Sequence, residues 1–122
     1  MNLGEIGQIS RPVRDTAEAV AFFGEKLGVP HLFTFGKLAF FDCGGVRLFL
    51  EESEESAASI LYFRVNDIQA AHAELTGKGV KFVQPPHMIH RHENGVEEWM
   101  AFFDDPQGRP LALMGQVQAK GD

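Results

Sequence analysis

Apolar and polar residues alternate along this chain with two different periods, and the order of those periods predicts its elements. Residues 5–10 alternate as a strand does, and apolar side chains then recur at the spacing of one helix face. That face carries Ala19, Val20, Phe22, Phe23 and Leu27. Three strands are expected next, at 31–35, 37–42 and 46–51, with a hairpin turn at Gly36. The first half therefore reads strand, helix, strand, strand, strand.

The second half repeats this order and some of its letters. Leu38-Ala39-Phe40-Phe41-Asp42 returns as Met100-Ala101-Phe102-Phe103-Asp104, and Val13-Arg14-Asp15 returns as Val65-Asn66-Asp67. The second half is expected to hold a helix from Asn66 or Asp67 to Leu75 and strands at 60–65, 80–84, 87–92, 96–104 and 111–114. One domain, residues 1–122, is predicted, with modules at about 3–51 and 60–115 and a linker at 52–59.

Local signals mark where these elements begin and end. Asp15 and Glu18 match a capping box at the first helix, and Gly28 is expected to end that helix. Proline is expected to end a strand at Arg11-Pro12 and again at Pro85-Pro86, and Asn94-Gly95 is the strongest hairpin signal. The phenylalanines of both repeats are expected in the core, Cys43 is expected to be a small buried residue, and the tail beyond Gly115 is expected to fray.

Composition and charge narrow the function classes. The net charge of −6 and the pI of about 5.3 argue against a nucleic-acid partner or an anionic membrane surface. A single cysteine excludes an internal disulfide and fits a reducing compartment. The N-terminus lacks a signal segment, and no apolar run approaches the roughly 20 residues of a membrane span. A soluble cytoplasmic protein is expected.

The paired Val-x-Asp helix starts, the segment Phe22–Gly28 and the segment Phe103–Gly108 together resemble the vicinal oxygen chelate superfamily, which includes glyoxalase I, bleomycin-resistance proteins and extradiol dioxygenases. The resemblance covers about residues 5–114. It implies an α+β fold in which two paired βαβββ modules form a curled mixed sheet around a cavity, with helices outside, and it implies a homodimer. In metal-using members, four side chains from the first and last strands of each module hold one divalent cation.

The internal repeat places those four metal positions at Gln8, Phe49, Ile60 and Ala112. Only Gln8 can coordinate a metal, so no cofactor is expected, and a divalent metal at a relocated site is the alternative. Strand parity adds further side chains to the cavity, because alternate residues share a face. The resulting ligand-binding candidates are Gln8, Arg47, Phe49, Tyr62, Arg64 and Ala112. Arg47 and Arg64 either suit an anionic ligand, pair with Glu51 or lie in solvent.

Glu51 is the candidate catalytic residue, as a general base or a relocated metal ligand. The competing interpretation, which is favoured, makes Glu51 the start of the solvated acidic run 51–55. His90 and His92 share a strand face and could bind one metal, although an exposed hairpin is the simpler interpretation. If that hairpin is a lid, His90 or Trp99 would touch ligand, with Trp99 stacking on an aromatic group.

Three functions remain open from the sequence. The first is a small-molecule-binding protein of the bleomycin-resistance type that acts without metal. The second is a metal-dependent lyase, isomerase or dioxygenase whose site has moved to Gln8, Glu51 and His90. The third is a non-catalytic partner or regulatory domain. The apolar character of three of the four metal positions favours the first.

Overall fold

The computed structural model describes residues 3–53, 59–106 and 108–118. The chain falls into two compact units, one formed by Gly7–Leu61 and the other by Met1–Ile6 with Tyr62–Asp122. Each unit carries a helix and a four-stranded sheet within the described ranges. The α+β class and the repeated order of strand, helix and three strands, both predicted from the sequence, are confirmed.

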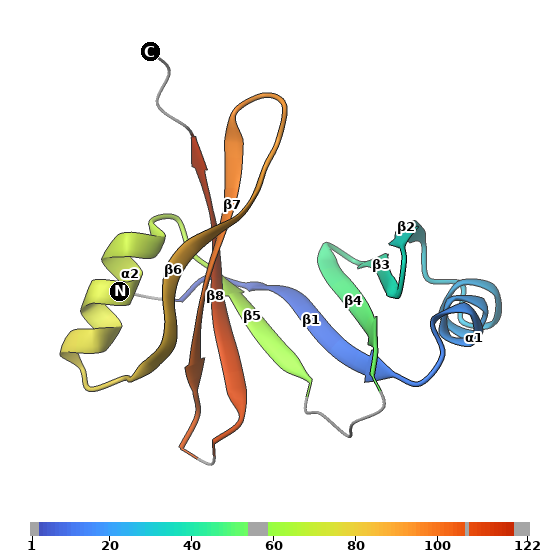
Figure 1. Ribbon diagram of the computed structural model, residues 1–122, viewed down its shortest axis with the longest axis horizontal. Coiled ribbons are helices and arrows are strands. Elements are labelled where there is room, and N and C mark those ends of the chain that lie inside the picture. Colours follow the sequence, from blue (N-terminus) through green and yellow to red (C-terminus); the bar gives the residue numbers. More distant parts are fainter. Residues whose placement is uncertain (1–2, 54–58, 107, 119–122) are drawn as a thin grey trace. The chain divides into compact units, whose positions relative to one another are not determined.

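The first unit builds its sheet in the order β2-β3-β4-β1 (Figure 1). Its elements are β1 (Ile6–Val13), α1 (Thr16–Val20), the π-helical η1 (Ala21–Lys26), β2 (His31–Phe35), β3 (Leu38–Cys43) and β4 (Val46–Glu52). Strands β2, β3 and β4 pair antiparallel, whereas β1 runs parallel to β4. This crossover through α1 places the helix over one face of the sheet and leaves the other face to carry a site.

The helix of the first unit begins where the sequence predicts. Asp15 Oδ1 accepts a hydrogen bond of 2.9 Å from the Glu18 N–H, which confirms Asp15 as the cap. The last turns widen into a π-helix, in which the Leu27 N–H donates to the Phe22 carbonyl at 3.0 Å. Gly28 then takes a positive φ of 73°, a conformation that glycine adopts without strain, and the helix ends there.

The core of the first unit lies between α1 and the sheet. It consists of Ala19, Ala39, Phe41 and Leu50. The expectation that the phenylalanines of the repeats belong to the core is wrong at Phe33 and Phe35, which are 51% and 74% exposed. Both lie on the edge strand β2, which has a sheet neighbour on one side only, so their side chains gain little cover. Cys43, at the end of β3, is exposed rather than buried.

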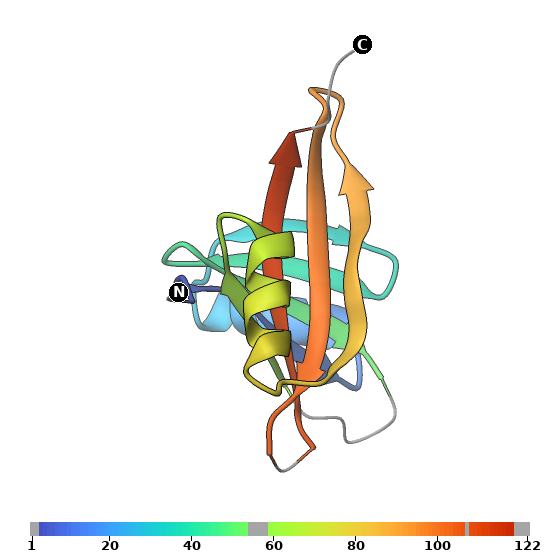
Figure 2. The same cartoon turned by 90° about the vertical axis from the view of Figure 1, so that its left-hand side faces the viewer.

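The second unit has the strand order β5-β8-β7-β6. Its elements are β5 (Ile60–Arg64), α2 (Ile68–Gly77), β6 (Phe82–Arg91), β7 (Val96–Asp104) and β8 (Pro110–Gln118). Asp67 caps α2 by accepting from the Ala70 N–H at 3.0 Å. The helix lies against the sheet (Figure 2), where Ile68 and Ala71 pack on Ala101, Phe103 and Leu113. Within the described ranges no helix is long and apolar enough to cross a membrane.

Strands β1, β6 and β8 extend well beyond their predicted bounds. Strand β1 continues through Pro12 to Val13, since proline's fixed φ is compatible with extended chain. Strand β6 is continuous through Pro85-Pro86, because an edge strand tolerates a missing N–H donor and the register shifts beside these prolines absorb the misfit. Strand β8 passes Gly115 and ends at Gln118, so the expected fraying is wrong for residues 116–118, while residues 119–122 lie outside the described ranges. Val117 and Gln118 pair with Glu97 and Val96 of β7.

The predicted linker 52–59 is described only at its ends. Glu52 is the last residue of β4, so the strand takes one residue that was assigned to the linker. Residues 54–58 lie outside the described ranges.

Candidate functional site

The sheet face of the first unit that turns away from α1 carries the polar and aromatic side chains predicted to bind ligand. We call it the open face, and its residues are Gln8, Ser10, Phe33, Phe40, Arg47 and Phe49. Gln8 and Arg47 are register partners on β1 and β4. Gln8 is 3% exposed, and its Oε1 accepts a hydrogen bond of 2.5 Å from Arg47 Nε. A buried amide thus fixes the position of a guanidinium.

An aromatic row crosses three strands of the open face. The Phe33 and Phe40 rings stack with centroids 4.5 Å apart, and the Phe40 and Phe49 rings stack at 4.8 Å with an interplanar angle of 6°. The Arg47 guanidinium carbon lies 5.6 Å from the centroid of Phe40. Sequence reasoning found Phe49 and Arg47 but assigned Phe33 and Phe40 to the core. The alternation of Phe40 with the buried Ala39 and Phe41 is the signal that could have separated them.

Glu51 lies at the far end of β4 from Arg47. It is exposed and four residues further along the strand, so about 13 Å separates the two backbone positions. The neighbouring Glu52 is the carboxylate with structural partners. Its Oε1 accepts from the Thr16 N–H at 2.9 Å, which lowers the pKa of Glu52, and Lys37 Nζ at 3.6 Å acts in the same direction. Glu52 therefore anchors the start of α1 to the sheet.

The sheet face of the second unit away from α2 carries mainly apolar side chains, several of them buried. Tyr62 is 4% exposed and meets the Phe102 ring edge-on at 6.0 Å. Ala112, a register partner of Phe102, is fully buried. Arg64 is exposed at the end of β5, where its N–H donates to the Glu5 carbonyl at 2.8 Å. Arg64 is the only charged residue among the ligand candidates named here, so these candidates do not form a cluster of charged side chains.

The two remaining ligand candidates, Trp99 and His90, lie apart from Tyr62 and Ala112. Trp99 packs on the core beneath α2, on the opposite face of the sheet, and its Nε1 donates to Glu97 Oε1 at 2.8 Å. His90 is exposed and pairs with Glu98, four residues along β7 from Phe102, or about 13 Å. Its ring meets that of His92 edge-on at 4.8 Å.

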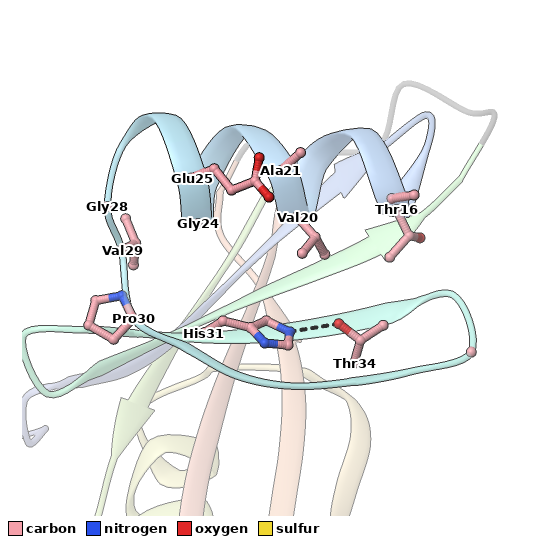
Figure 3. A pocket seen from close by; sticks show the side chains of 12 residues that line it. Thr16, Val20, Ala21, Gly24, Glu25, Gly28, Val29, Pro30, His31 and Thr34 are labelled. Carbon is pink, nitrogen blue, oxygen red and sulfur yellow. Dashed lines mark hydrogen bonds between the residues drawn. The ribbon is translucent and has the colours of Figure 1, made fainter.

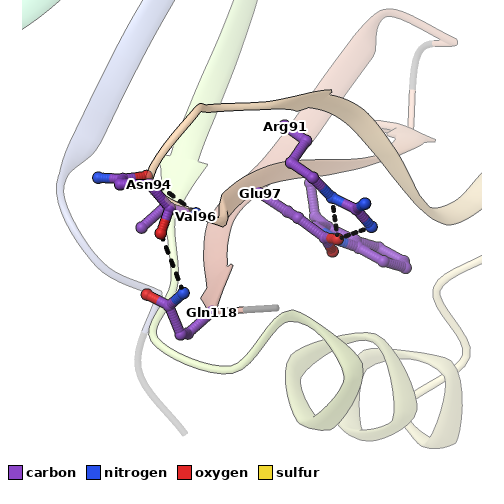
Figure 4. Close-up of polar contacts among 6 residues, drawn as sticks. Arg91, Asn94, Val96, Glu97 and Gln118 are labelled. Atoms are coloured by element: carbon purple, nitrogen blue, oxygen red, sulfur yellow. Dashed lines mark hydrogen bonds and ion pairs between the residues drawn. The ribbon is translucent and has the colours of Figure 1, made fainter. Parts of the chain in front are cut away.

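An ion pair and a side-chain hydrogen bond stabilise the β6–β7 hairpin (Figure 4). Arg91 Nε donates to Glu97 Oε2 at 2.9 Å, and Glu97 is 6% exposed. The turn is closed by Asn94, whose Oδ1 accepts from the Val96 N–H at 3.0 Å. No three histidine, cysteine or acidic side chains gather as a metal site anywhere in the described chain.

The pKa of Glu97 is lowered, first by the Trp99 hydrogen bond and then by Arg91, from an ordinary value of 4.5. A lowered folded-state pKa gives stability that is present above about pH 4.5 and is lost as the pH falls through the folded value. We therefore expect Glu97→Gln to lower the urea midpoint at pH 7, and the gap from wild type to narrow between pH 5 and 3. Glu93→Gln, an exposed change in the same hairpin, is the control. If the urea midpoints of wild type and Glu97→Gln differed by the same amount at every pH, the lowered pKa of Glu97 would not be a source of stability.

A groove of about 710 Å³ lies between the first helix and β2 (Figure 3). Val20, Ala21 and Glu25 line its helix side, while His31 and Thr34 line its strand side, and His31 Nε2 lies 2.7 Å from Thr34 Oγ1. The groove's histidine is thus hydrogen-bonded within its own strand. Because the open face instead holds a cation on a buried amide beside stacked rings, we take it as the candidate site.

Comparisons with known proteins agree with this architecture. A sequence model described as the Glyoxalase/Bleomycin resistance protein/Dioxygenase superfamily matches residues 5–113. A superfamily member from Vibrio splendidus has a TM-score of 0.72 at 13% identity, over 95% of this chain and 100% of that chain. The Mn(II)-bound glyoxalase from Novosphingobium aromaticivorans has a TM-score of 0.72 at 16% identity, over 98% of this chain and 42% of that chain.

A methylmalonyl-CoA epimerase from Streptomyces coelicolor, in complex with 2-nitronate-propionyl-CoA, has a TM-score of 0.69 at 18% identity, over 99% of this chain and 100% of that chain. At these identities the structural likeness concerns the fold alone. No curated protein matches the sequence.

Proposed function

The chain belongs to the glyoxalase/bleomycin resistance protein/dioxygenase superfamily, and from this premise we propose that it binds a small, partly apolar molecule on the open face of its first unit. Binding uses no divalent metal at the position that metal-dependent relatives use.

One observation carries the proposal: the middle ring of a stacked row lies beside a guanidinium that is hydrogen-bonded to a buried amide. Small-molecule sites are mostly apolar, with a few polar groups fixed in position. Phe33, Phe40 and Phe49 supply the apolar surface, and the pair of Arg47 with Gln8 supplies the fixed polar group. Rings in such a row offer an aromatic ligand offset or edge contacts, each worth about 0.5–1.5 kcal/mol beyond the area they bury.

The donor chemistry at the four positions that the internal repeat predicts for a metal does not fit a divalent cation. Phe49, Ile60 and Ala112 offer no ligand atom, and the oxygen of Gln8 accepts a hydrogen bond from a positively charged group. A second cation at that oxygen would meet the guanidinium at close range, where like charges repel most strongly. No step of the proposed function therefore runs through a metal.

The test is an NMR titration of the ¹⁵N-labelled protein with benzyl alcohol, indole and phenylacetate. We expect amide shifts to concentrate in β3 and β4, and Phe49→Leu, which removes the stack on Phe40, to weaken binding by about twofold to tenfold. Phe22→Leu is the matched control, because Phe22 is 46% exposed on the helix. Shifts confined to the groove beside β2, or equal affinities for Phe49→Leu and wild type, would count against the open face.

Metal analysis separates this proposal from the metal-dependent alternative. Untagged protein is assayed by elemental analysis before and after dialysis against a chelator. We expect less than a stoichiometric amount of any divalent ion, and no change in thermal stability with added Zn²⁺, Ni²⁺, Mn²⁺ or Fe²⁺. About one tightly held ion per chain would overturn metal-free binding and favour the enzyme reading.

A further inference from the structure

We propose that β2 is a docking edge, where an extended peptide with basic side chains pairs as a further strand and lies along the groove beside the first helix. The occupant is a segment of a partner protein rather than a second copy, because a chain with a net charge of −6 attracts basic partners and repels copies of itself. The inference concerns the edge of the first unit's sheet and goes beyond small-molecule binding on the open face.

Strand β2 has an open hydrogen-bonding edge. Among the described strands it pairs with β3 alone, and it stands last in the sheet of its unit. Phe35 and Leu38 flank a two-residue turn, and in such hairpins the flanking residues form the hydrogen-bonded pair. Hydrogen bonding alternates along an antiparallel strand, so the N–H and C=O of Thr34 face away from β3. An added strand would pair with these two groups.

The usual defences of an edge strand are sparse on β2. Natural edge strands are blunted by lysine, proline or bulges, because a bare edge recruits other chains. All five residues of β2 are exposed, none of them is acidic, lysine or proline, and the one register shift lies near its start, between His31 and Phe33. The edge strand of the second unit, β6, instead contains Pro85-Pro86 and three register shifts. The chain therefore protects one edge and leaves the other open to addition.

The groove of about 710 Å³ beside this edge would receive one side of the added strand (Figure 3). Its helix wall includes Val20 and, from the π-helical turn η1, Ala21 and Glu25. Such turns are rare and frequently occur at functional sites. Side chains of an extended strand alternate between its faces, so every second residue would enter the groove, and the others would meet the exposed Phe33 and Phe35.

Glu25 selects a basic side chain for the groove. Its carboxylate has no ion-pair or hydrogen-bond partner among the described residues. The described residues that line the groove include neither lysine nor arginine, and Lys37 Nζ is held 3.6 Å from Glu52 Oε2. A lysine of the added strand would pack its apolar stem on Val20 and Ala21 while its ammonium group reaches the Glu25 carboxylate. The partner segment is therefore expected to alternate apolar and basic residues.

The test is an NMR titration of the ¹⁵N-labelled protein with a capped peptide of about seven residues that alternates valine with lysine. We expect amide shifts to concentrate in β2 and η1. An N-methylated version of the peptide lacks the ladder donors and should bind about tenfold or more weakly. Shifts elsewhere, or equal binding of the N-methylated peptide, would overturn strand addition.

The basic character of the partner has its own comparison. A peptide that alternates valine with glutamate should bind about threefold or more weakly than the lysine peptide, and Glu25→Gln should remove most of this preference. Equal binding of the two peptides to wild type would overturn the basic partner. So would a preference that Glu25→Gln leaves unchanged.

Thr34→Pro separates strand addition from binding in the groove alone. It removes the outward N–H at a position where an edge strand tolerates proline, so the peptide should bind about tenfold more weakly. Thr34→Val is the matched control, because it also loses the hydroxyl beside His31 Nε2 but keeps the N–H, and it should bind as wild type does. Thermal melts verify the fold of each variant, and the N-methylated peptide tests the same contact in the unaltered protein.

Light scattering tests the competing occupant. We expect the mass of the peptide-free protein to be the same for wild type and Thr34→Pro at every concentration. A mass that doubles with concentration in wild type and stays at one chain in Thr34→Pro would assign the edge to a second copy and overturn the peptide partner.

Discussion

Replacing Phe41 by alanine is expected to lower the free energy of unfolding by about 3–5 kcal/mol. Phe41 is fully buried at the centre of the first unit's core. Its ring meets Phe23 at 6.1 Å and His31 at 5.2 Å, so truncation leaves a cavity that both the helix and β2 would have to close. The measurement is urea unfolding followed by far-ultraviolet circular dichroism.

Phe35→Ala is the matched control for this substitution. Phe35 belongs to the same sheet but is 74% exposed, so its truncation removes little packing and should change stability by less than about 0.5 kcal/mol. If Phe35→Ala and Phe41→Ala lowered the free energy of unfolding by similar amounts, the Phe35 side chain would have to be buried in solution, which would contradict its exposure here.

Much of the fold could be predicted because its signals are local. Asp15 and Asp67 begin their helices through hydrogen bonds that span three residues. Asn94-Gly95 closes a hairpin whose second strand, Val96–Asp104, has the predicted bounds. Because the two modules repeat, a helix start recognised in one module also predicts a helix start at the equivalent residue of the other. In each case the residues that determine the structure lie next to the structure they determine.

The predicted strand ends are wrong where pairing with a neighbouring strand determines how far a strand extends. Proline predicts a break, yet β6 continues through Pro85-Pro86 because it lies at a sheet edge. The polar residues after Gly115 look like a frayed tail, yet the Gln116 side chain donates to Glu98 Oε2 at 2.9 Å and extends β8 along its partner. Neither the edge position nor the length of a pairing strand can be read from one segment.

The candidate site shows the same division. Parity along β4 placed Arg47 and Phe49 together, and counting across the repeat identified Gln8 as their neighbour. The sequence did not identify Phe40 as a site residue. Two consecutive phenylalanines both suggest core until the sheet face of each ring is known. Trp99 is a ligand candidate only if the β6–β7 hairpin acts as a lid, and its side chain packs on the core beneath α2. The sequence gives the alternation of faces, while packing of a helix selects which face becomes core.

Leu113→Ala tests the second core in the same way, with an expected loss of about 2–5 kcal/mol. Leu113 is fully buried, and by the repeat it corresponds to Leu50, which is equally buried in the first unit. Trp99, the only tryptophan in the sequence, packs on the cluster that contains Leu113, so its fluorescence during urea unfolding reports on this core. Ile89→Ala removes an aliphatic side chain that is 49% exposed on β6, and it should cost much less. If Leu113→Ala and Ile89→Ala lowered the urea midpoint of the Trp99 fluorescence transition equally, burial of Leu113 would not be the source of the packing energy between α2 and the sheet.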